Sequence, residues 1–350
     1  MQRLTITVPR ILDLHSSLEF SRVLAEVELQ SAVQLDFARC DRVEPFGLLL
    51  ISSEIALLRK RIGSSIECVN TNHMVEAAQM GFFYALGVEH GVQLVQANSQ
   101  VIPVTIFDCE TMIRNAALKG VETGDEVETQ SRKMSEMLCR TDEGDVYDTL
   151  AYAIREIMRN VLEHSSAMRF GICAKFYENL SRVEVAILDR GVGLKCSLSK
   201  NPHLDASDDR RAINYALMPA VSGKAFKGSR VKQSGPWANS GFGLYMTNRI
   251  CRNGGNFFVA TGQSGMLLTK GQGKRYFDCD FSGTAIRMII RTDSLSSLRN
   301  ALAQYRQDGY SIQSKYREIV RIDPSSASLM LSADFDLSTW DRLLARLKGK

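Results

Sequence analysis

The sequence lacks the apolar run of about 18 residues that a membrane span requires. Its beginning, MQRLTITVPRILDL, has no basic region followed by a continuous apolar core, so we expect no signal peptide. The 43 basic and 39 acidic residues nearly balance, and a net charge of +4 does not by itself indicate nucleic acid. These absences favour a cytoplasmic protein that contacts neither a membrane nor nucleic acid.

The eight cysteines are widely scattered and include no C-x-x-C pair. We therefore expect neither a zinc cluster nor a compact disulfide framework. Reduced cysteines that fill small spaces in a cytoplasmic protein are the simpler interpretation.

The 350 residues, 45% of them hydrophobic, are enough for about two globular domains of an α/β fold. The first domain is expected over residues 1–115, and its first 95 or so residues alternate short apolar strands with helical patterns, which predicts a largely parallel sheet with crossover helices. A polar, acidic segment at 116–145 predicts a linker, in which a helix could start near Thr129. Residues 146–292 predict a mixed sheet with helices on one face, and residues 293–350 a helical extension. The helices we expect cover about 17–28, 46–61, 74–83, 146–164, 243–253 and 295–307, and four short strands separated by glycines follow residue 255.

The helix over 146–164 has two distinct faces. Apolar residues recur every three or four positions on one face. Glu156, Asn160 and Glu163 fall together on the opposite side. An exposed polar face is the ordinary interpretation of such a pattern, but the motifs that follow favour a functional one.

Three glycine-containing motifs come next in the chain. DRGVG (189–193) follows an apolar strand and puts a carboxylate beside backbone that can approach a ligand closely. SGFGL (240–244) opens a helix, where backbone N–H groups and the helix dipole favour phosphate. SGT (282–284) leads into a strand, where a small hydroxyl residue could join Asp189 at a bound base. Each motif alone is weak, but their order after E-x-x-x-N is distinctive.

In this order the motifs resemble those of the GHKL ATPase superfamily, whose members share the Bergerat ATP-binding fold. The resemblance covers roughly residues 130–292 and is closest to the ATPase domains of anti-sigma-factor kinases and histidine kinases. It implies ATP and Mg²⁺ as cofactors. Asn160 would coordinate Mg²⁺, and Glu156 would be the catalytic residue that orients or deprotonates the attacking water or hydroxyl.

The resemblance also implies the residues that bind the nucleotide. Asp189 would accept the amino hydrogen of adenine, and Thr284 would support the same end. Gly191 and Gly193 would admit the adenine ring. The phosphates would be wrapped at the helix start by Gly241, Gly243 and Leu244.

The loop over 195–240 would then be the ATP lid. One of its basic residues could reach the γ-phosphate, although a solvated loop is an equal alternative; these residues are Lys224, Lys227, Arg230 and Lys232. His164 ends the helix in the form RNVLEHS, which is similar to the anti-sigma-factor kinase branch. We expect a histidine that favours the helix dipole there rather than a metal ligand.

Residues 1–95 resemble a STAS domain, the fold of anti-sigma-factor antagonists, by pattern rather than by signature. In that family a serine that the partner kinase phosphorylates often precedes the second helix. Here the loop reads EPFG (44–47), so the serine is absent, and Ser52 and Ser53 lie a turn or more into the helix. The fold could serve as a docking module or an intramolecular regulator.

The leading interpretation is a regulatory protein that binds and hydrolyses Mg-ATP and whose lid controls contacts with a protein partner or with the STAS-like part. An anti-sigma type protein kinase is the second, since Glu156 could serve a hydroxyl instead of water. A nucleotide-dependent scaffold of a signalling or defence complex is the third interpretation. The protein could also form a homodimer. DNA strand passage and mismatch repair are disfavoured because the residues after 292 are too few for a transducer domain.

Overall fold

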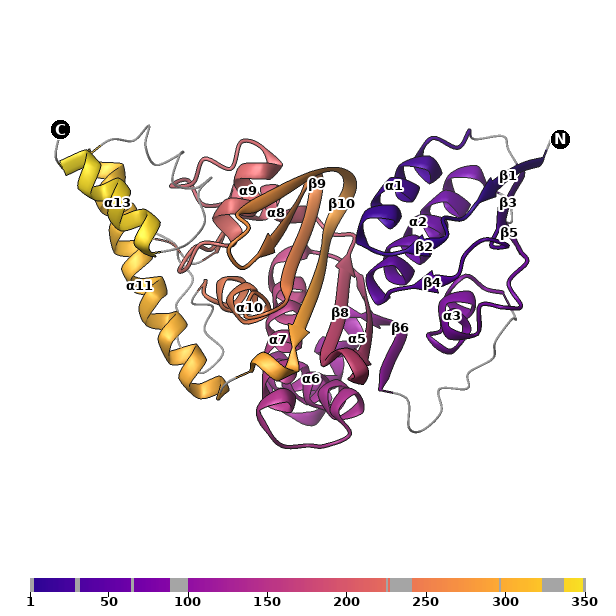
Figure 1. Cartoon of the computed structure of the whole chain (residues 1–350), viewed down its shortest axis with the longest axis horizontal. Helices are drawn as coiled ribbons and strands as arrows, with labels where there is room; N and C mark the ends of the chain where they lie inside the picture. Colours follow the sequence, from indigo (N-terminus) through magenta and orange to yellow (C-terminus); the bar gives the residue numbers. More distant parts are fainter. Residues whose placement is uncertain are drawn as a thin grey trace.

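The computed structural model describes residues 3–28, 32–63, 66–88, 100–224, 226, 241–295, 297–322 and 337–348. These ranges form a mixed α/β structure with two main sheets in successive parts of the chain. Figure 1 shows the first sheet near the N-terminus, the second in the middle and two helices at the opposite end. No helix within these ranges has both the length and the apolarity to cross a membrane. All eight cysteines are free thiols.

The N-terminal unit (residues 3–88) contains a three-stranded parallel sheet. Its strands are β1 (Arg3–Thr7), β2 (Ile11–Leu12), β3 (Ala32–Asp36), β4 (Arg42–Val43) and β5 (Ile66–Val69), and its helices are α1 (Leu14–Ala25), α2 (Pro45–Ile62), α3 (Val75–Gln79) and α4 (Phe82–Ala85). The sheet has the order β1-β3-β5, and β2 and β4 form a separate parallel pair. Val33 and Leu35 of the central strand are buried and their neighbours are half-buried, as alternation predicts. The expected parallel sheet with crossover helices is confirmed.

The single helix expected over 74–83 is wrong, because α3 and α4 replace it. Gly81 between them has a φ of +73°, in the left-handed region that no α-helical residue occupies. The turn directs Phe82 and Phe83 into the core, where both rings meet Phe37 edge-on.

The central unit (residues 100–295) contains a five-stranded sheet. Its strands are β6 (Val101–Asp108), β7 (Arg169–Tyr177), β8 (Arg182–Asp189), β9 (Asn256–Thr269) and β10 (Lys274–Arg291). Their order is β6-β7-β8-β10-β9, and every neighbouring pair is antiparallel. The mixed sheet we expected is therefore wrong. The four short strands expected after residue 255 are instead two long ones, with register shifts between Asp278 and Ala285.

Helices cover one face of this sheet. They include α5 (Cys109–Lys119), α6 (Thr123–Cys139), α7 (Asp145–Asn160), α8 (Gly193–Leu198), α9 (Asp209–Ala216) and α10 (Gly243–Cys251). The expected long helix is confirmed as α7, which continues into a π-helical turn at Val161–Ser165. Leu150, Ile154 and Ile157 of α7 are at most 1% exposed and face the sheet.

The solvated linker expected over 116–145 is wrong for most of its length. α6 occupies much of this segment and packs beside α7 and the sheet, with Val127, Met134 and Leu138 in the hydrophobic core. The domain boundary expected at residue 115 also falls inside the central unit, because β6 pairs with β7.

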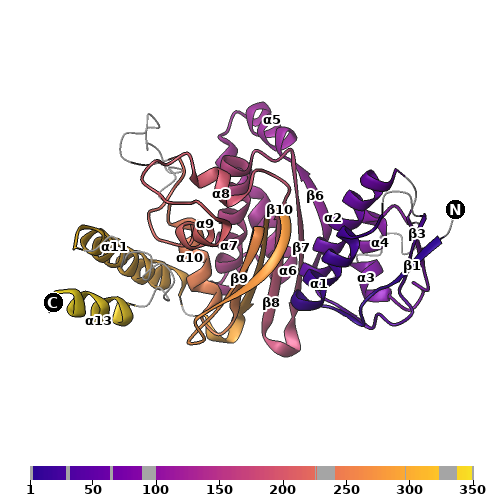
Figure 2. The ribbon, with the colours of Figure 1, turned by 90° about the horizontal axis from the view of Figure 1, so that it is seen from above.

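The other face of the five-stranded sheet is covered by the N-terminal unit, a contact that the sequence did not indicate. Figure 2 shows α1 and α2 on the side of the sheet away from α7 and α10. α2 contacts β7, β8 and β10, and the apolar core of the N-terminal unit includes Cys173, Ala186 and Leu188 from the sheet. Helix α2 is therefore apolar on several sides because it is buried on several sides.

Two helices, α11 (Leu298–Ile322) and α13 (Leu337–Lys348), lie in the segment where a helical extension was expected. The helix expected over 295–307 is longer, because α11 also takes in the segment YREIVRI. Ile312 and Trp340 are fully buried and join the core of the central unit. The extension is thus attached to the central unit by apolar packing.

Replacing Gly309 with valine should destabilise the protein at the contact between α11 and α10. A Cβ atom at Gly309 would lie 2.6 Å from a ring carbon of Phe242 and 3.0 Å from Cβ of Pro219. Overpacking of this kind costs about 1–3 kcal/mol. Thermal unfolding followed by circular dichroism measures the loss, and Gln307→Val, at an exposed position of α11, is the matched control. Equal losses in both variants would contradict a steric contact at Gly309.

Candidate functional site

A pocket opens between α7, the end of β8 and the start of α10. Its enclosed part has a volume of about 90 Å³, and it is continuous with solvent at its mouth. Segments far apart in the sequence meet here because β8 and β10 are neighbours and α7 and α10 lie on the same face of the sheet. Seven of the nine residues expected at the site line it: Asn160, Asp189, Gly193, Gly241, Gly243, Leu244 and Thr284.

Asp189 is the buried carboxylate of this pocket. It ends β8, pairs in register with Thr284 of β10, and is 2% exposed. Burial raises the pKa of Asp189 to about 6, although the Gly191 N–H donates to its Oδ1 at 2.8 Å and the Thr284 N–H also favours the charged form. A carboxylate in such an environment is a strong acceptor for a ligand N–H group.

Gly191 does not line the main pocket. A Cβ atom there would lie 2.1 Å from the carbonyl oxygen of Ser165, and the same carbonyl accepts the Val192 N–H at 2.7 Å. Gly191 is therefore needed for close approach of two backbone segments. Gly193 lines the pocket with a φ of +73°, which an L side chain adopts only with strain.

The N-terminus of α10 forms another wall. Phe242 is its N-cap residue, and the Phe242 side chain makes no capping hydrogen bond. Gly243 and Leu244 of the first turn line the pocket, so backbone N–H groups and the positive end of the helix dipole are presented to it. This wall is suited to an anion such as phosphate.

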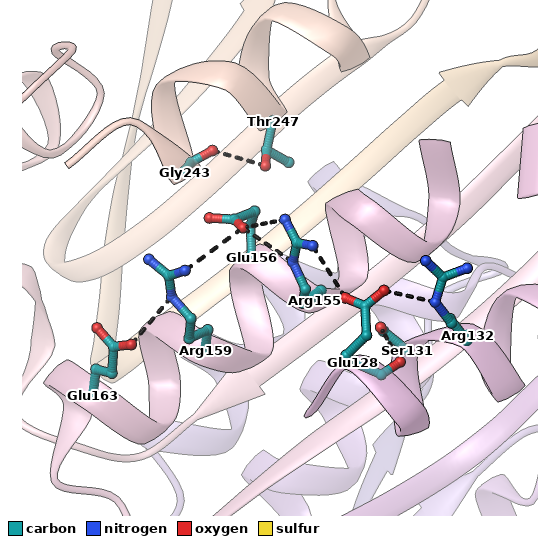
Figure 3. Close-up of polar contacts among 9 residues, drawn as sticks. All are labelled: Glu128, Ser131, Arg132, Arg155, Glu156, Arg159, Glu163, Gly243 and Thr247. Atoms are coloured by element: carbon teal, nitrogen blue, oxygen red, sulfur yellow. Dashed lines mark hydrogen bonds and ion pairs between the residues drawn. The ribbon is translucent and has the colours of Figure 1, made fainter. Parts of the chain in front are cut away.

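Asn160 and Glu156 come from α7 but differ in position. Asn160 lines the pocket, whereas Glu156 is 5% exposed and lies outside the lining. Figure 3 shows the Glu156 carboxylate between Arg155 and Arg159, below Gly243. Arg155 Nη2 donates to Glu156 Oε1 at 2.8 Å, and Arg159 Nη1 is 4.0 Å from the same oxygen. A Cβ atom at Gly243 would lie 2.2 Å from Glu156 Oε2, so this carboxylate sits against the first turn of α10.

Two arginines of this network were missed from the sequence. Arg159 lines the pocket and pairs with Glu163 at 3.1 Å, and Arg155 pairs with Glu128 of α6 at 3.0 Å. The spacing of Arg159 from Glu156, three residues on one helix, could have indicated their contact. The partner Glu128 could not be found this way, because its segment was expected to connect two domains rather than to pack beside α7.

His164 also lines the pocket, and burial lowers its pKa to about 4. It is neutral at pH 7, so the expected interaction of a cationic histidine with the helix dipole is wrong.

The segment expected to be a lid contains α8 and α9. Lys224 donates through its ammonium group to the carbonyl oxygen of Glu163 at the pocket rim. Lys227, Arg230 and Lys232, together with Ser240, lie outside the described residues.

The loop at 44–47 is buried against the five-stranded sheet. Glu184 Oε1 of β8 accepts the Phe46 N–H at 3.2 Å, and a Cβ atom at Gly47 would lie 2.3 Å from the carbonyl oxygen of Leu12. The hydroxyl of Ser52 is also buried and donates to the Leu49 carbonyl at 3.0 Å. This loop is therefore an internal contact rather than an open modification site.

Comparisons with protein families, with curated proteins and with solved structures find no match to this chain.

Proposed function

We propose that the chain is a regulatory protein that binds Mg-ATP in this pocket and hydrolyses it, in the manner of the GHKL superfamily that its motifs resemble. The lid segment over 195–240 would close on the nucleotide and change contacts with a protein partner or with the N-terminal unit, which resembles a STAS domain. Assembly as a homodimer is one form that such a partnership would take.

One observation carries this proposal: a buried carboxylate and a helix N-terminus are walls of the same pocket. Asp189 supplies the acceptor that the amino group of adenine requires. The start of α10 supplies the environment that a triphosphate requires. A pocket with only one of these features would fit many ligands, whereas the pair favours an adenine nucleotide.

The residues of α7 fit the metal and the reaction. Mg²⁺ bound with phosphates usually takes only one or two protein ligands and keeps several waters, so the amide oxygen of Asn160 is a sufficient protein ligand. The ion would neutralise charge on the phosphates. Glu156, one turn earlier, would orient the attacking water and accept its proton.

A nucleotide-dependent scaffold is the second candidate, and the pairing of Glu156 favours it. A carboxylate held by Arg155 at 2.8 Å, with Arg159 nearby, has fewer free lone pairs for a water molecule. Hydrolysis would require the contact between Glu156 and Arg155 to loosen when nucleotide binds. A scaffold that only binds nucleotide would not require this change.

The first experiment follows both binding and the fate of the γ-phosphate. Equilibrium binding of Mg-ATP and Mg-ADP to the full chain tests the site, and release of labelled phosphate tests turnover. Binding with release supports the ATPase, and binding without release supports the scaffold. Label transferred to a protein would indicate the kinase, for which Glu156 would serve a hydroxyl. Absence of binding would overturn the proposal.

A further inference from the structure

Arg190 lies between two residues of the expected adenine loop but points away from the pocket. Successive side chains of an extended segment alternate between the faces of a sheet. Asp189 faces the pocket, so Arg190 faces α2 on the opposite side. Its guanidinium donates to Glu54 Oε1 at 2.6 Å and to Ser53 Oγ at 3.0 Å.

The guanidinium of Arg190 is held on a third side by an aromatic ring. Its Cζ lies 4.0 Å from the ring centroid of Phe281 on β10, a cation–π contact. Phe281 is buried and lies close in sequence to Thr284, which pairs with Asp189. The side chains of Arg190 and Glu54 are only 22% and 11% exposed, so solvent does not compete strongly for them.

α2 is itself fixed on the sheet near its start. Glu184, which is fully buried, accepts Arg287 Nε at 2.9 Å, and Arg287 Nη2 reaches Glu44 Oε2 at 3.0 Å. The helix is therefore anchored to β8 and β10 near its N-terminus and again at Glu54. A displacement of α2 would be transmitted to Arg190 and, through the backbone, to Asp189.

We propose that Glu54 and Arg190 are positioning residues through which the N-terminal unit holds Asp189 in place and so sets the preference of the pocket for adenine. This inference rests on the proposed function. Because the amino group of adenine is a donor and the corresponding oxygen of guanine is an acceptor, discrimination between them depends on where the Asp189 carboxylate lies. The phosphate wall at α10 lies on the opposite side of the sheet from α2 (Figure 2) and would recognise both nucleotides alike.

The test compares the affinities of ADP and GDP for wild type, Glu54→Gln and Arg190→Gln, measured by calorimetry on the full chain. We expect ADP binding to weaken by about tenfold in either variant, with GDP binding much less affected, because the lost contacts are charge-assisted hydrogen bonds. The ratio of the two affinities is the decisive readout, since general destabilisation would lower both together. In a double-mutant cycle, the combined variant should lose little more than either single one.

Glu67→Gln is the matched control, because it neutralises a glutamate of the same unit whose exposed side chain pairs with Arg3 across the small sheet. It should leave both affinities unchanged. An unchanged ratio in Glu54→Gln and Arg190→Gln, with wild type preferring ADP, would overturn the inference but keep the proposed function. A wild type that binds neither nucleotide would overturn the proposed function itself.

Discussion

The Asp189→Asn variant should bind adenine nucleotides about 10- to 100-fold more weakly than wild type while being more stable in the absence of ligand. The loss of affinity follows from replacing a charged acceptor, since a hydrogen bond to a charged group contributes roughly 1.5–3 kcal/mol. The gain in stability follows from burial. Ionised Asp189 is 2% exposed, and removing its charge removes an unfavourable desolvation.

The pH dependence of this gain has a definite sign. The pKa of Asp189 is about 6 in the folded protein, above its ordinary value of 3.8, so the folded state holds its proton more tightly than the unfolded state. Wild type therefore loses stability from this group as the pH rises from about 4 to 6 and does not regain it above pH 6. The shift corresponds to at most about 3 kcal/mol. Asparagine does not titrate, so the difference between the proteins should be present at pH 8 and absent at pH 4.

Thermal unfolding of both proteins at pH 4 and pH 8, with and without Mg-ADP, measures both effects. Without ligand, the variant should unfold at a higher temperature at pH 8. With Mg-ADP, wild type should gain stability by mass action and the variant should gain far less. Glu67→Gln is a suitable control, because this glutamate lies in the N-terminal sheet and pairs with Arg3, away from the pocket. Equal ligand-induced shifts in wild type and Asp189→Asn would contradict the assignment of Asp189 to the base.

The sequence predicted the parts of the fold whose pattern is local and strong. The apolar stripe of α7 and the apolar run of β8 are both present at nearly the expected positions. Asp189 was identified as a site residue because a carboxylate follows the apolar run of β8. Gly243 was identified because two closely spaced glycines precede and open a helix. Their meeting in one pocket could be expected only from the order of the motifs.

The packing of α6 into the core was missed because its buried face contains serines as well as apolar residues. Ser131 and Ser135 are fully buried, and their hydroxyls donate to the backbone carbonyls of Glu128 and Tyr147 at 2.8 and 2.6 Å. A hydroxyl that is satisfied in this way costs little to bury, yet it counts as polar in any hydrophobic pattern. In the sequence, the buried face of α6 therefore resembled part of a solvated linker.

Contacts between distant segments were also beyond the sequence pattern. Strand direction and the cover of the second sheet face depend on which segments meet, and alternation within one strand does not specify that. Glu184 and Arg287 are charged residues within apolar strands, and this pattern could have indicated a buried charge pair. Their partner Glu44 lies in another unit, so the contact became evident only in the structure.

The Glu156→Gln variant should bind Mg-ATP as wild type does but hydrolyse it about 10²–10⁴-fold more slowly, the usual contribution of a general base. A glutamine side chain fills the same space against Gly243 as glutamate does, but its amide cannot act as a general base. The fold should tolerate the change, because Arg155 keeps Glu128 at 3.0 Å and Arg159 keeps Glu163 at 3.1 Å. We therefore expect a loss of stability smaller than the ~3–5 kcal/mol of a buried charge left alone.

Glu128→Gln separates chemistry from disturbance of the charge network in Figure 3. It removes a charge from the same network, since Glu128 contacts Arg155 at 3.0 Å and Arg132 at 2.6 Å, yet it does not line the pocket. Release of labelled phosphate under single-turnover conditions should fall in Glu156→Gln and stay near wild type in Glu128→Gln. Equal losses in both variants would mean that the network positions α7 and that Glu156 has no role of its own. Unchanged turnover in Glu156→Gln would mean that its carboxylate serves only to hold the two arginines against the start of α10.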